Sequence, residues 1–289
     1  MSDNFYGLAT RVLQNEHLRV EFLTEAGPRI VRLLLRGSEG NWLAETPQKK
    51  VATPHGDYFF RGGHRLWYAP ERIPDTYQPD NDGLTVEELA DGVCLRQPAE
   101  PHTGIRKSIA IHLDPCRAAL TLTHRIENTG AQSIELAPWA ITMLKLGGVA
   151  ILPQPVGAVD EHGFLPNRHL VLWSYTRIND LRLELGDALI RVHARAQLPA
   201  CKIGYLNQAG WIAYWRAGIL FVKRFARHAD QPHVDFNCNA EVYCNDEFIE
   251  LETLAPLVRL SPGQSVTHDE NWEFYSDVTL ESLPSELMK

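Results

Sequence analysis

The sequence predicts an all-β protein in which large antiparallel sheets pack face to face. Short segments with alternating apolar and polar residues recur along the whole chain, and this period of two is typical of strands with one buried face. Long stretches with apolar residues at helical spacing do not occur. Because β-sandwiches and barrels of roughly 200 to 250 residues fold as one unit, we expect a single domain that covers residues 1–289.

The expected strands follow one another in chain order. In residues 18–22, 31–35 and 109–113, apolar side chains occupy alternate positions. Residues 120–127 alternate in the same way, and the turn Asn128-Thr-Gly130 ends that strand. Further strands are expected at residues 134–140, 169–173, 188–194, 211–215, 218–226, 240–244, 248–253 and 266–275. This number of strands requires two large packed sheets.

Composition and charge exclude several classes of function. The chain has 36 acidic and 28 basic residues, and its net charge of -8 disfavours binding to nucleic acid or to an anionic membrane. No basic region precedes an apolar stretch at the N-terminus, and no run reaches the roughly 18 apolar residues of a membrane helix. Five widely spaced cysteines without a CxxC pair favour reduced thiols. We expect a soluble, cytoplasmic protein, and its oligomeric state stays open.

The densest irregular segment covers residues 46–82, where five prolines and several glycines predict a long ordered loop. Within it, residues 60–71 combine cations, aromatic rings and a carboxylate: Arg61, His64, Arg65, Trp67, Tyr68 and Glu71. A sugar ring offers apolar C–H faces and many hydroxyl groups, so these residue types together favour a carbohydrate site. The alternative is a packed surface loop in which Trp67 is the hydrophobic anchor.

Charged residues also fall on the predicted strands late in the chain. Lys223 shares a strand face with apolar residues, so it either extends to solvent along that face or points into a site. Glu241, Glu250 and Glu252 lie on two successive strands. Buried carboxylates without partners are costly, so at least one of the three should meet a cation or a ligand hydroxyl.

No signature of a metal or cofactor site is present. The twelve histidines include no HxH or HExxH pair, and neither a glycine-rich phosphate loop nor a GxSxG turn occurs. We therefore expect no metal and no cofactor. His124 lies among Leu120, Leu122 and Ile126 on one strand face, which favours a core or cleft-wall histidine over a catalytic one.

Several short motifs, in order and spacing, resemble those of the galactose mutarotase-like (aldose 1-epimerase-like) superfamily. They are Gly27-Pro-Arg-Ile-Val-Arg-Leu33, Arg61-Gly-Gly63, Glu127-Asn-Thr-Gly130, Glu250-Leu-Glu-Thr-Leu-Ala-Pro256 and Ser261-Pro-Gly263. The form Gly62-Gly-His-Arg-Leu-Trp67 is closer to a branch distinct from the true aldose epimerases. The resemblance implies a large antiparallel β-supersandwich of the galactose mutarotase-like kind.

The resemblance also implies catalytic roles. In the enzymes of that family, a late glutamate before a proline is the general base, and Glu252 matches it. The family's general acid is a histidine after the Asn-x-Gly turn, but this chain has Trp139 and no histidine there. A second family histidine precedes the Gly-Gly pair, where this chain has Arg61 before the pair and His64 after it. His64, or failing it Lys223, is therefore the expected acid.

We accordingly expect a protein that binds a small carbohydrate, with aldose 1-epimerase-like isomerisation by proton transfer as its reaction. The loop and the late strands should meet at one cleft, with Glu252 and His64 catalytic. The residues expected to bind the sugar are Arg61, Arg65, Trp67, Glu71, Trp139, Lys223 and Glu241. One alternative is a non-catalytic carbohydrate-binding or sensing protein. Another is a glycosidase or polysaccharide lyase, in which Glu241 or Tyr243 would act opposite Glu252.

Overall fold

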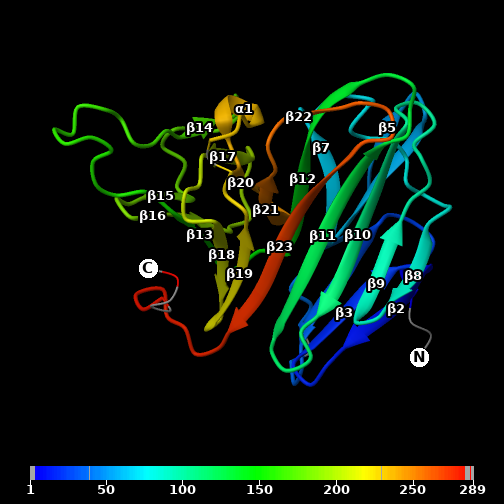
Figure 1. Cartoon of the computed structure of the whole chain (residues 1–289). Helices are drawn as coiled ribbons and strands as arrows, with labels where there is room; N and C mark the ends of the chain where they lie inside the picture. Colours follow the sequence, from blue (N-terminus) through cyan, green and yellow to red (C-terminus); the bar gives the residue numbers. More distant parts are fainter. Residues whose placement is uncertain (1–3, 39, 229, 284–286, 288–289) are drawn as a thin grey trace.

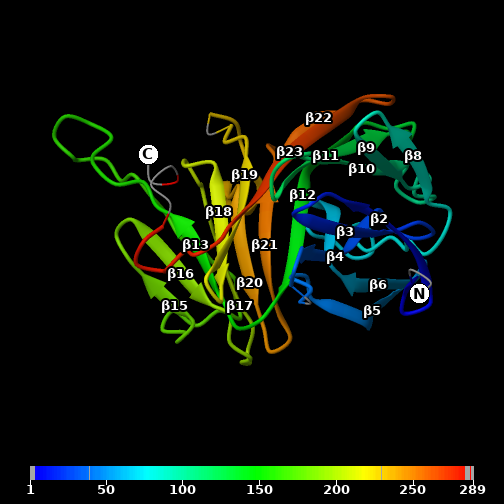
Figure 2. The ribbon, with the colours of Figure 1, turned by 90° about the horizontal axis from the view of Figure 1, so that it is seen from below.

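The structure is a computed structural model that describes residues 4–38, 40–228, 230–283 and 287, and its regular structure is almost entirely β-strand (Figure 1). Two large antiparallel sheets pack against each other, and β11 and β23 of one sheet pass over β12 of the other (Figures 1 and 2). The predicted all-β fold class is confirmed. A single turn, α1 (Val234–Asn237), is assigned as helix among the described residues.

The first sheet contains eleven strands. Its order is β1 (Asn4–Phe5), β2 (Leu8–Gln14), β3 (Leu18–Leu23), β4 (Arg29–Leu35), β7 (His64–Ala69), β12 (Ile134–Lys145), β21 (Phe248–Leu254), β20 (Ala240–Cys244), β17 (Cys201–Tyr205) and β14 (Val171–Leu172), with β22 (Val258–Leu260) paired to β12. Strands far apart in the chain, such as β7 and β21, are thereby held on either side of β12.

The second sheet contains ten strands. Its order is β15 (Leu183–Leu185), β16 (Leu189–His193), β13 (Val149–Pro153), β18 (Trp211–Arg216), β19 (Ile219–Phe225), β23 (Ser265–Tyr275), β11 (Ala119–Asn128), β10 (Ile105–Leu113), β9 (Gly92–Arg96) and β8 (Thr85–Leu89). The long loop between β13 and β14 projects away from both sheets (Figure 1).

The structure corrects the expectation of one long irregular loop over residues 46–82. Most of that segment is strand, because β5 (Glu45–Thr53) and β6 (Gly56–Gly62) form a separate hairpin that runs on into β7. The prolines do not prevent this arrangement. Pro47 lies where the pairing of β5 with β6 shifts register, and Pro54 lies in the connecting turn, both positions at which no ladder hydrogen bond is lost.

Two consecutive glycines allow the tight junction between β6 and β7. Gly62 and Gly63 have φ angles of 86° and 73°, a left-handed backbone that favours glycine. A Cβ atom at Gly62 would lie 2.1 Å from the carbonyl oxygen of Ala44, and one at Gly63 would lie 1.9 Å from that of Ile30. The close approach of these backbones fixes where β7 enters the sheet, and so fixes the side chains that β7 presents.

The space between the two sheets is filled mainly by large apolar side chains, such as Phe22, Tyr214, Phe221 and Trp272. Alternate residues of each strand point into this interior, and the residues between them point to the outer face. On β7, Leu66 and Tyr68 belong to the main core, whereas Trp67 belongs to a smaller cluster on the outer face of the sheet. This alternation decides which polar residues can meet in one site.

A chain of polar side chains crosses the apolar interior. Lys223 lies 2.9 Å from Glu270, whose second oxygen accepts a hydrogen bond from the indole of Trp272. The Thr253 hydroxyl donates to Glu270 and accepts from His268. We call the residues Lys223, Glu270, Thr253, His268, His124 and His64 the interior polar chain; their relative exposure is 3% or less.

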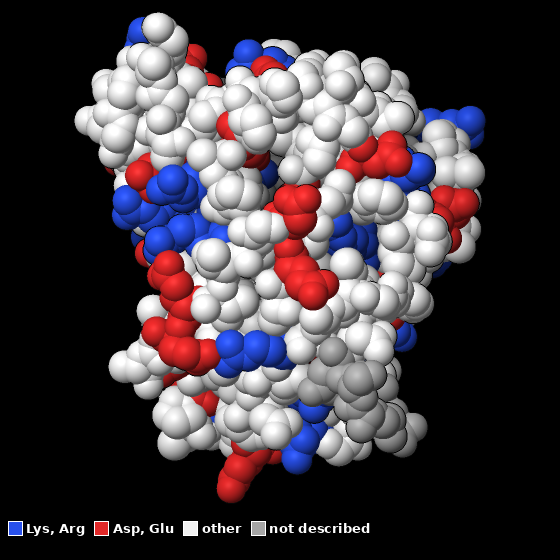
Figure 3. All heavy atoms as spheres, turned by 90° about the vertical axis from the view of Figure 1, so that its right-hand side faces the viewer, with Lys and Arg blue, Asp and Glu red and all other residues white. Residues whose placement is uncertain are grey.

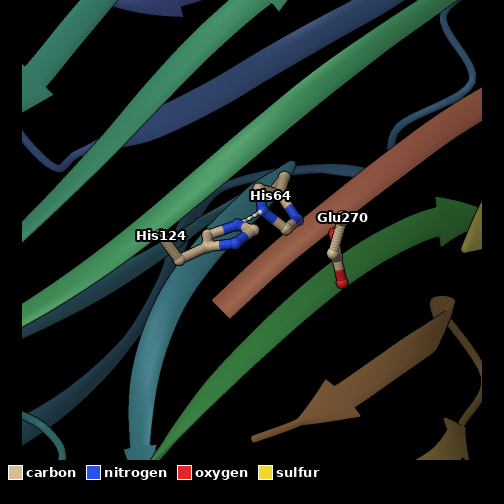
Figure 4. A group of neighbouring side chains, drawn as sticks. All are labelled: His64, His124 and Glu270. Atoms are coloured by element: carbon tan, nitrogen blue, oxygen red, sulfur yellow. Dashed lines mark hydrogen bonds between the residues drawn. The ribbon is translucent and has the colours of Figure 1, made fainter. Parts of the chain in front are cut away.

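The three imidazoles of the interior polar chain are neutral, and their proton positions follow from their contacts. His124 Nδ1 lies 2.8 Å from the carbonyl oxygen of His268, so it donates, and Nε2 of His124 must accept. His64 Nε2, at 2.7 Å, is the donor to it (Figure 4). Burial lowers the pKa of His64 and of His124, and lowers that of His268 to about 3.

These low pKa values predict that acid weakens the fold. Because His268 is neutral when folded but takes up a proton near pH 6.5 when unfolded, its contribution is complete above that pH and is lost as the pH falls toward 3. Urea unfolding between about pH 6 and pH 4.5 should show the wild type losing about 1.4 kcal/mol per pH unit relative to His268→Gln. Equal pH slopes for the two proteins would contradict this assignment.

Acidic and basic side chains are interspersed on the face of the molecule shown in Figure 3. Exposed ion pairs of the chain include Arg11 with Glu88 and Arg96 with Glu87. Within the part of the chain that the structure describes, no helix is both long enough and apolar enough to cross a membrane.

Candidate functional site

A cavity of about 180 Å³ lies on the outer face of the eleven-stranded sheet, over its adjacent strands β7, β12, β21, β20 and β17. Its walls combine aromatic rings with charged groups. The lining residues are Lys49, Phe60, Arg65, Trp67, Glu71, Tyr77, Trp139, Tyr175, Lys202, Tyr243, Phe248, Glu250 and Glu252. This volume is below the roughly 300 to 1,000 Å³ of sites for drug-sized ligands, so it suits one small ring.

Strand register brings the charged residues of the cavity together. Arg65 pairs with Ile141 on β12, which in turn pairs with Glu252 on β21, and Glu252 lies opposite Glu241 on β20. These positions form one row across the sheet, and side chains in such a row point to the same face. Residues from widely separated parts of the sequence therefore share one surface.

Glu252 is fully buried, and only one of its two carboxylate oxygens is engaged. Oε2 accepts hydrogen bonds from the indole Nε1 of Trp139 at 2.8 Å and from Lys202 Nζ at 2.9 Å. Oε1 has no hydrogen-bond partner among the described residues. A buried acceptor without a donor is costly, so Oε1 is suited to accept a proton or a hydrogen bond from a ligand.

Lys202 stabilises the negative charge of Glu252. Its Nζ lies 2.7 Å from Glu241 and 2.9 Å from Glu252, and 4.6 Å from the ring centres of both Trp139 and Trp173. Burial alone would lower the pKa of Lys202, but the two carboxylates hold it well above its ordinary value. A lysine that keeps its proton so firmly stabilises the charge of Glu252 and does not itself serve as an acid.

Glu241 lies behind Lys202 and is completely buried. Burial raises its pKa well above the ordinary value, and the neighbouring Glu252 adds to the rise that Lys202 opposes. Gly204 on β17 provides the space for it, because a Cβ atom there would lie 3.1 Å from Glu241 Cγ and 3.2 Å from the Trp173 ring. The absence of a side chain at Gly204 thus allows the glutamate and the indole to pack together.

Arg65 and Glu250 form a second hydrogen-bonded pair in the cavity. Arg65 Nη2 donates to Glu250 Oε1 at 2.9 Å, and the guanidinium stacks 4.2 Å from the ring centre of Trp67. Nε and Nη1 of Arg65 are buried and have no partner within the described structure. Burial, with Glu252 nearby, raises the pKa of Glu250, although Arg65 opposes the rise.

Aromatic rings also line the cavity, next to the charged groups. Trp67 packs edge-on against Trp139 and Tyr77, and its indole Nε1 donates to the hydroxyl of Tyr58 at 2.7 Å. The Tyr77 hydroxyl donates to the carboxylate of Glu71, which holds that exposed side chain at the cavity. Rings fixed in this way offer a rigid apolar surface beside the charged groups.

Five of the residues predicted from sequence line this cavity together: Arg65, Trp67, Glu71, Trp139 and Glu252. A sixth, Glu241, contacts it through Lys202. Lys202 and Tyr175, which sequence reasoning did not consider, also line it. So do Glu250, expected only as a possible partner of a cation or ligand, and Tyr243, considered only for the glycosidase or lyase alternative. The alternation of Cys201, Ile203 and Tyr205 with Lys202 was the available signal for a strand there.

The structure places three predicted site residues elsewhere. His64 precedes Arg65 on β7, so its ring points into the interior and not into the cavity. Lys223 belongs to the second sheet and lies inside the interior polar chain, where it donates to the carbonyl oxygen of Leu251 at 3.0 Å. Arg61 pairs with Asp80 at 2.6 Å and lines a different depression on the surface.

His64, His124 and Glu270 lie close enough together to raise the question of a metal site (Figure 4). Their potential ligand atoms are already engaged. The two Nε2 atoms share a hydrogen bond, and His64 Nδ1 contacts the Thr142 hydroxyl at 2.9 Å. Glu270 forms an ion pair with Lys223 and accepts hydrogen bonds from Trp272 and Thr253. In this arrangement the three side chains form part of a hydrogen-bond chain, and Lys223 balances the charge of Glu270.

Comparison with solved structures identifies the fold. A galactose mutarotase-like protein from Lactobacillus casei superposes with a TM-score of 0.58 and 11% identity, over 92% of this chain and 100% of that one. A candidate aldose 1-epimerase from Escherichia coli gives 0.59 and 14%, over 93% and 100%. A galactose mutarotase related enzyme from Lactobacillus acidophilus gives 0.54 and 10%, over 93% and 98%.

No family model matches the sequence, and no curated protein does. At these identities the likeness establishes the fold alone. The chain has the galactose mutarotase-like fold, and the prediction of that fold from short sequence motifs is confirmed.

Proposed function

We propose that this protein binds a single sugar ring in the cavity and interconverts its anomers by proton transfer. The observation that carries the proposal is the pair Glu250 and Glu252, two buried carboxyl groups in different electrostatic surroundings beside a wall of aromatic rings. Two carboxyl groups held in different surroundings can serve as acid and base in one reaction.

Glu252 is the base. Lys202 and Trp139 bind its Oε2 and stabilise the ionised form, while Oε1 remains available to the ligand. In the reaction, Oε1 takes the proton of the C1 hydroxyl, the C1 to O1 bond becomes a carbonyl, and the bond from C1 to the ring oxygen breaks. Rotation about the bond from C1 to C2 and reclosure on the other face give the second anomer.

Glu250 is the acid in this proposal, in place of the expected His64. Its raised pKa favours the protonated form, which can donate to the ring oxygen as the ring opens. None of the described residues that line the cavity is a histidine. Arg65 stabilises Glu250 after it has released its proton, and the reverse transfers restore both groups when the ring closes.

The remaining lining residues would bind the sugar. Trp67 and Phe60 offer apolar surface to the C–H face of a ring. The free donors Nε and Nη1 of Arg65 and the carboxylate of Glu71 suit hydroxyl groups, which both accept and donate. The hydroxyl groups of a bound sugar would form hydrogen bonds with these Arg65 and Glu71 groups, and the Arg65 donors otherwise have no partner within the described structure.

A specific observation favours one alternative, a carbohydrate-binding protein without catalysis. Proton transfer in the proposed reaction depends on two glutamates alone, because imidazole is absent from the described lining of the cavity. Such a protein would bind the same sugars and leave the rate of mutarotation unchanged.

Polarimetry on freshly dissolved α-glucose and α-galactose separates the two functions. We expect the protein to accelerate the approach to the equilibrium rotation, in proportion to its concentration, because a positioned acid and base each contribute about 10²- to 10⁴-fold. Heat-denatured protein is the control. Binding of either sugar in calorimetry without any acceleration would favour the alternative function, and an absence of both would refute the proposal.

A further inference from the structure

In and next to the cavity, carboxyl groups outnumber lysine and arginine side chains. Each lysine or arginine that lines it already contacts a carboxylate: Lys49 pairs with Glu247, Arg65 with Glu250, and Lys202 with both Glu241 and Glu252. Glu71 adds a carboxylate that accepts a hydrogen bond from the neutral hydroxyl of Tyr77. The lining itself has equal numbers of cations and carboxyl groups, three of each, and the ion-pair partners Glu241 and Glu247 raise the carboxyl groups to five. All three cations are already paired.

Acceptor atoms in the buried part of this group lack donors. Oε1 of Glu252 has no hydrogen-bond partner among the described residues, and neither does Oε1 of Glu241, whose Oε2 lies 2.7 Å from Lys202 Nζ. Both side chains are fully buried, and Glu252 lines the cavity. Buried acceptors of this kind are best satisfied by a ligand that brings donors, most strongly by a cationic one.

The turn α1 adds a further carboxyl group to this group. Asp235, Phe236 and Asn237 all have positive φ angles, a backbone that non-glycine residues adopt at a cost. Val234 of the same turn packs in the apolar cluster that contains Trp67 and Trp139, so α1 borders the cavity wall. Glu241, Lys202 and Glu252 all influence the pKa of Asp235, which burial raises above its ordinary value.

We propose that the cavity selects amino sugars, so that affinity falls as the charge of the ligand changes from positive through neutral to negative. This inference rests on the proposed function, because it assumes that C1 of a sugar lies at Glu252. The C2 substituent is next to the C1 hydroxyl, so an amine at C2 would lie nearest to the carboxyl groups around Glu252. A phosphate or carboxylate would meet cations that already contact carboxyl groups.

Calorimetry with a series of closely related ligands tests the order. At about pH 6, where the amine is protonated, D-glucosamine should bind about tenfold more tightly than D-glucose, and glucose 6-phosphate and glucuronate at least about tenfold more weakly. D-galactosamine and D-galactose repeat the comparison. Cyclohexylamine carries the charge without hydroxyl groups, and it should bind more weakly than either amino sugar.

Two variants connect the preference to the named residues. Asp235→Asn suits the left-handed backbone, and Glu241→Gln keeps the shape of the buried side chain. Each should reduce the ratio of glucosamine to glucose affinity by about threefold or more. The control Glu88→Gln, on β8 of the second sheet and in an exposed pair with Arg11, should leave the ratio unchanged. Should Glu241→Gln fail to fold, the variant Asp235→Asn, at a half-buried position of the turn, still provides the test.

The outcomes are distinct for the two proposals. Tighter binding of glucose 6-phosphate than of glucose, equal binding of cyclohexylamine and glucosamine, or an unchanged ratio in both variants would overturn the selection of amino sugars and leave sugar binding intact. If none of the neutral or amino sugars binds, the proposed function itself is refuted.

Discussion

Replacement of Glu252 by glutamine is expected to lower the rate of anomer interconversion by about 10²-fold or more, while hexose affinity changes only a few-fold. The amide retains an oxygen that can accept from Trp139 and Lys202, so the side chain keeps its place. It loses the basic Oε1, which is the atom that receives the proton. Saturation-transfer NMR between the α and β anomers measures the rate, and calorimetry measures the affinity.

The matched control for this experiment is Glu184→Gln. Glu184 lies on β15 and pairs with Arg191 at an exposed position, so its loss of charge should not change the rate. Full activity of Glu252→Gln on every responsive sugar would show that the base is another group. The same assay applied to Glu250→Gln examines the acid, and its retention of full activity would remove Glu250 from that role.

The largest expected effect on stability comes from breaking the buried ion pair between Lys223 and Glu270. Lys223→Met leaves the Glu270 carboxylate buried without its cation, and loss of one partner of a buried pair costs about 3 to 5 kcal/mol. The double variant Lys223→Met with Glu270→Leu should recover most of this loss, because apolar residues can replace a buried pair. Urea unfolding gives the free energy of unfolding for each protein.

The contrasting case is the exposed pair of Arg11 and Glu88, where Arg11→Gln should change the free energy of unfolding by less than about 1 kcal/mol. If the single variant Lys223→Met were as stable as the wild type, the pair would not carry the assigned charge. If the double variant were no more stable than the single one, the unpaired carboxylate would not be the cause of the loss.

The all-β fold and much of the cavity wall could be predicted from the sequence, because period-two alternation is a local property. Arg65 and Trp67 are two positions apart on one strand, and their side chains share a face as the alternation predicts. His64 is adjacent to Arg65, so its side chain points to the opposite face of the sheet once residues 64–69 are recognised as a strand. The prolines and glycines around that segment instead indicated a loop, in which alternate residues do not point to opposite faces.

Other features depend on strand pairing, which a single sequence does not reveal. Lys202 reaches Glu252 because β17, β20 and β21 are neighbours in the sheet, although 50 residues separate the two side chains in the chain. Lys223 had two expected positions, and it occupies neither, because Glu270 on the adjacent β23 supplies a counter-charge in the interior. The position of a buried charged side chain therefore depends on its counter-charge, which lies far away in the sequence.

A crystal structure of the protein with a bound hexose tests the central claim most directly. The account predicts one sugar ring in the cavity, packed against Trp67, with its C1 hydroxyl within hydrogen-bond distance of Glu252 Oε1 and its ring oxygen toward Glu250. A sugar bound at another place on the molecule, or bound in this cavity with C1 directed away from both glutamates, would contradict it.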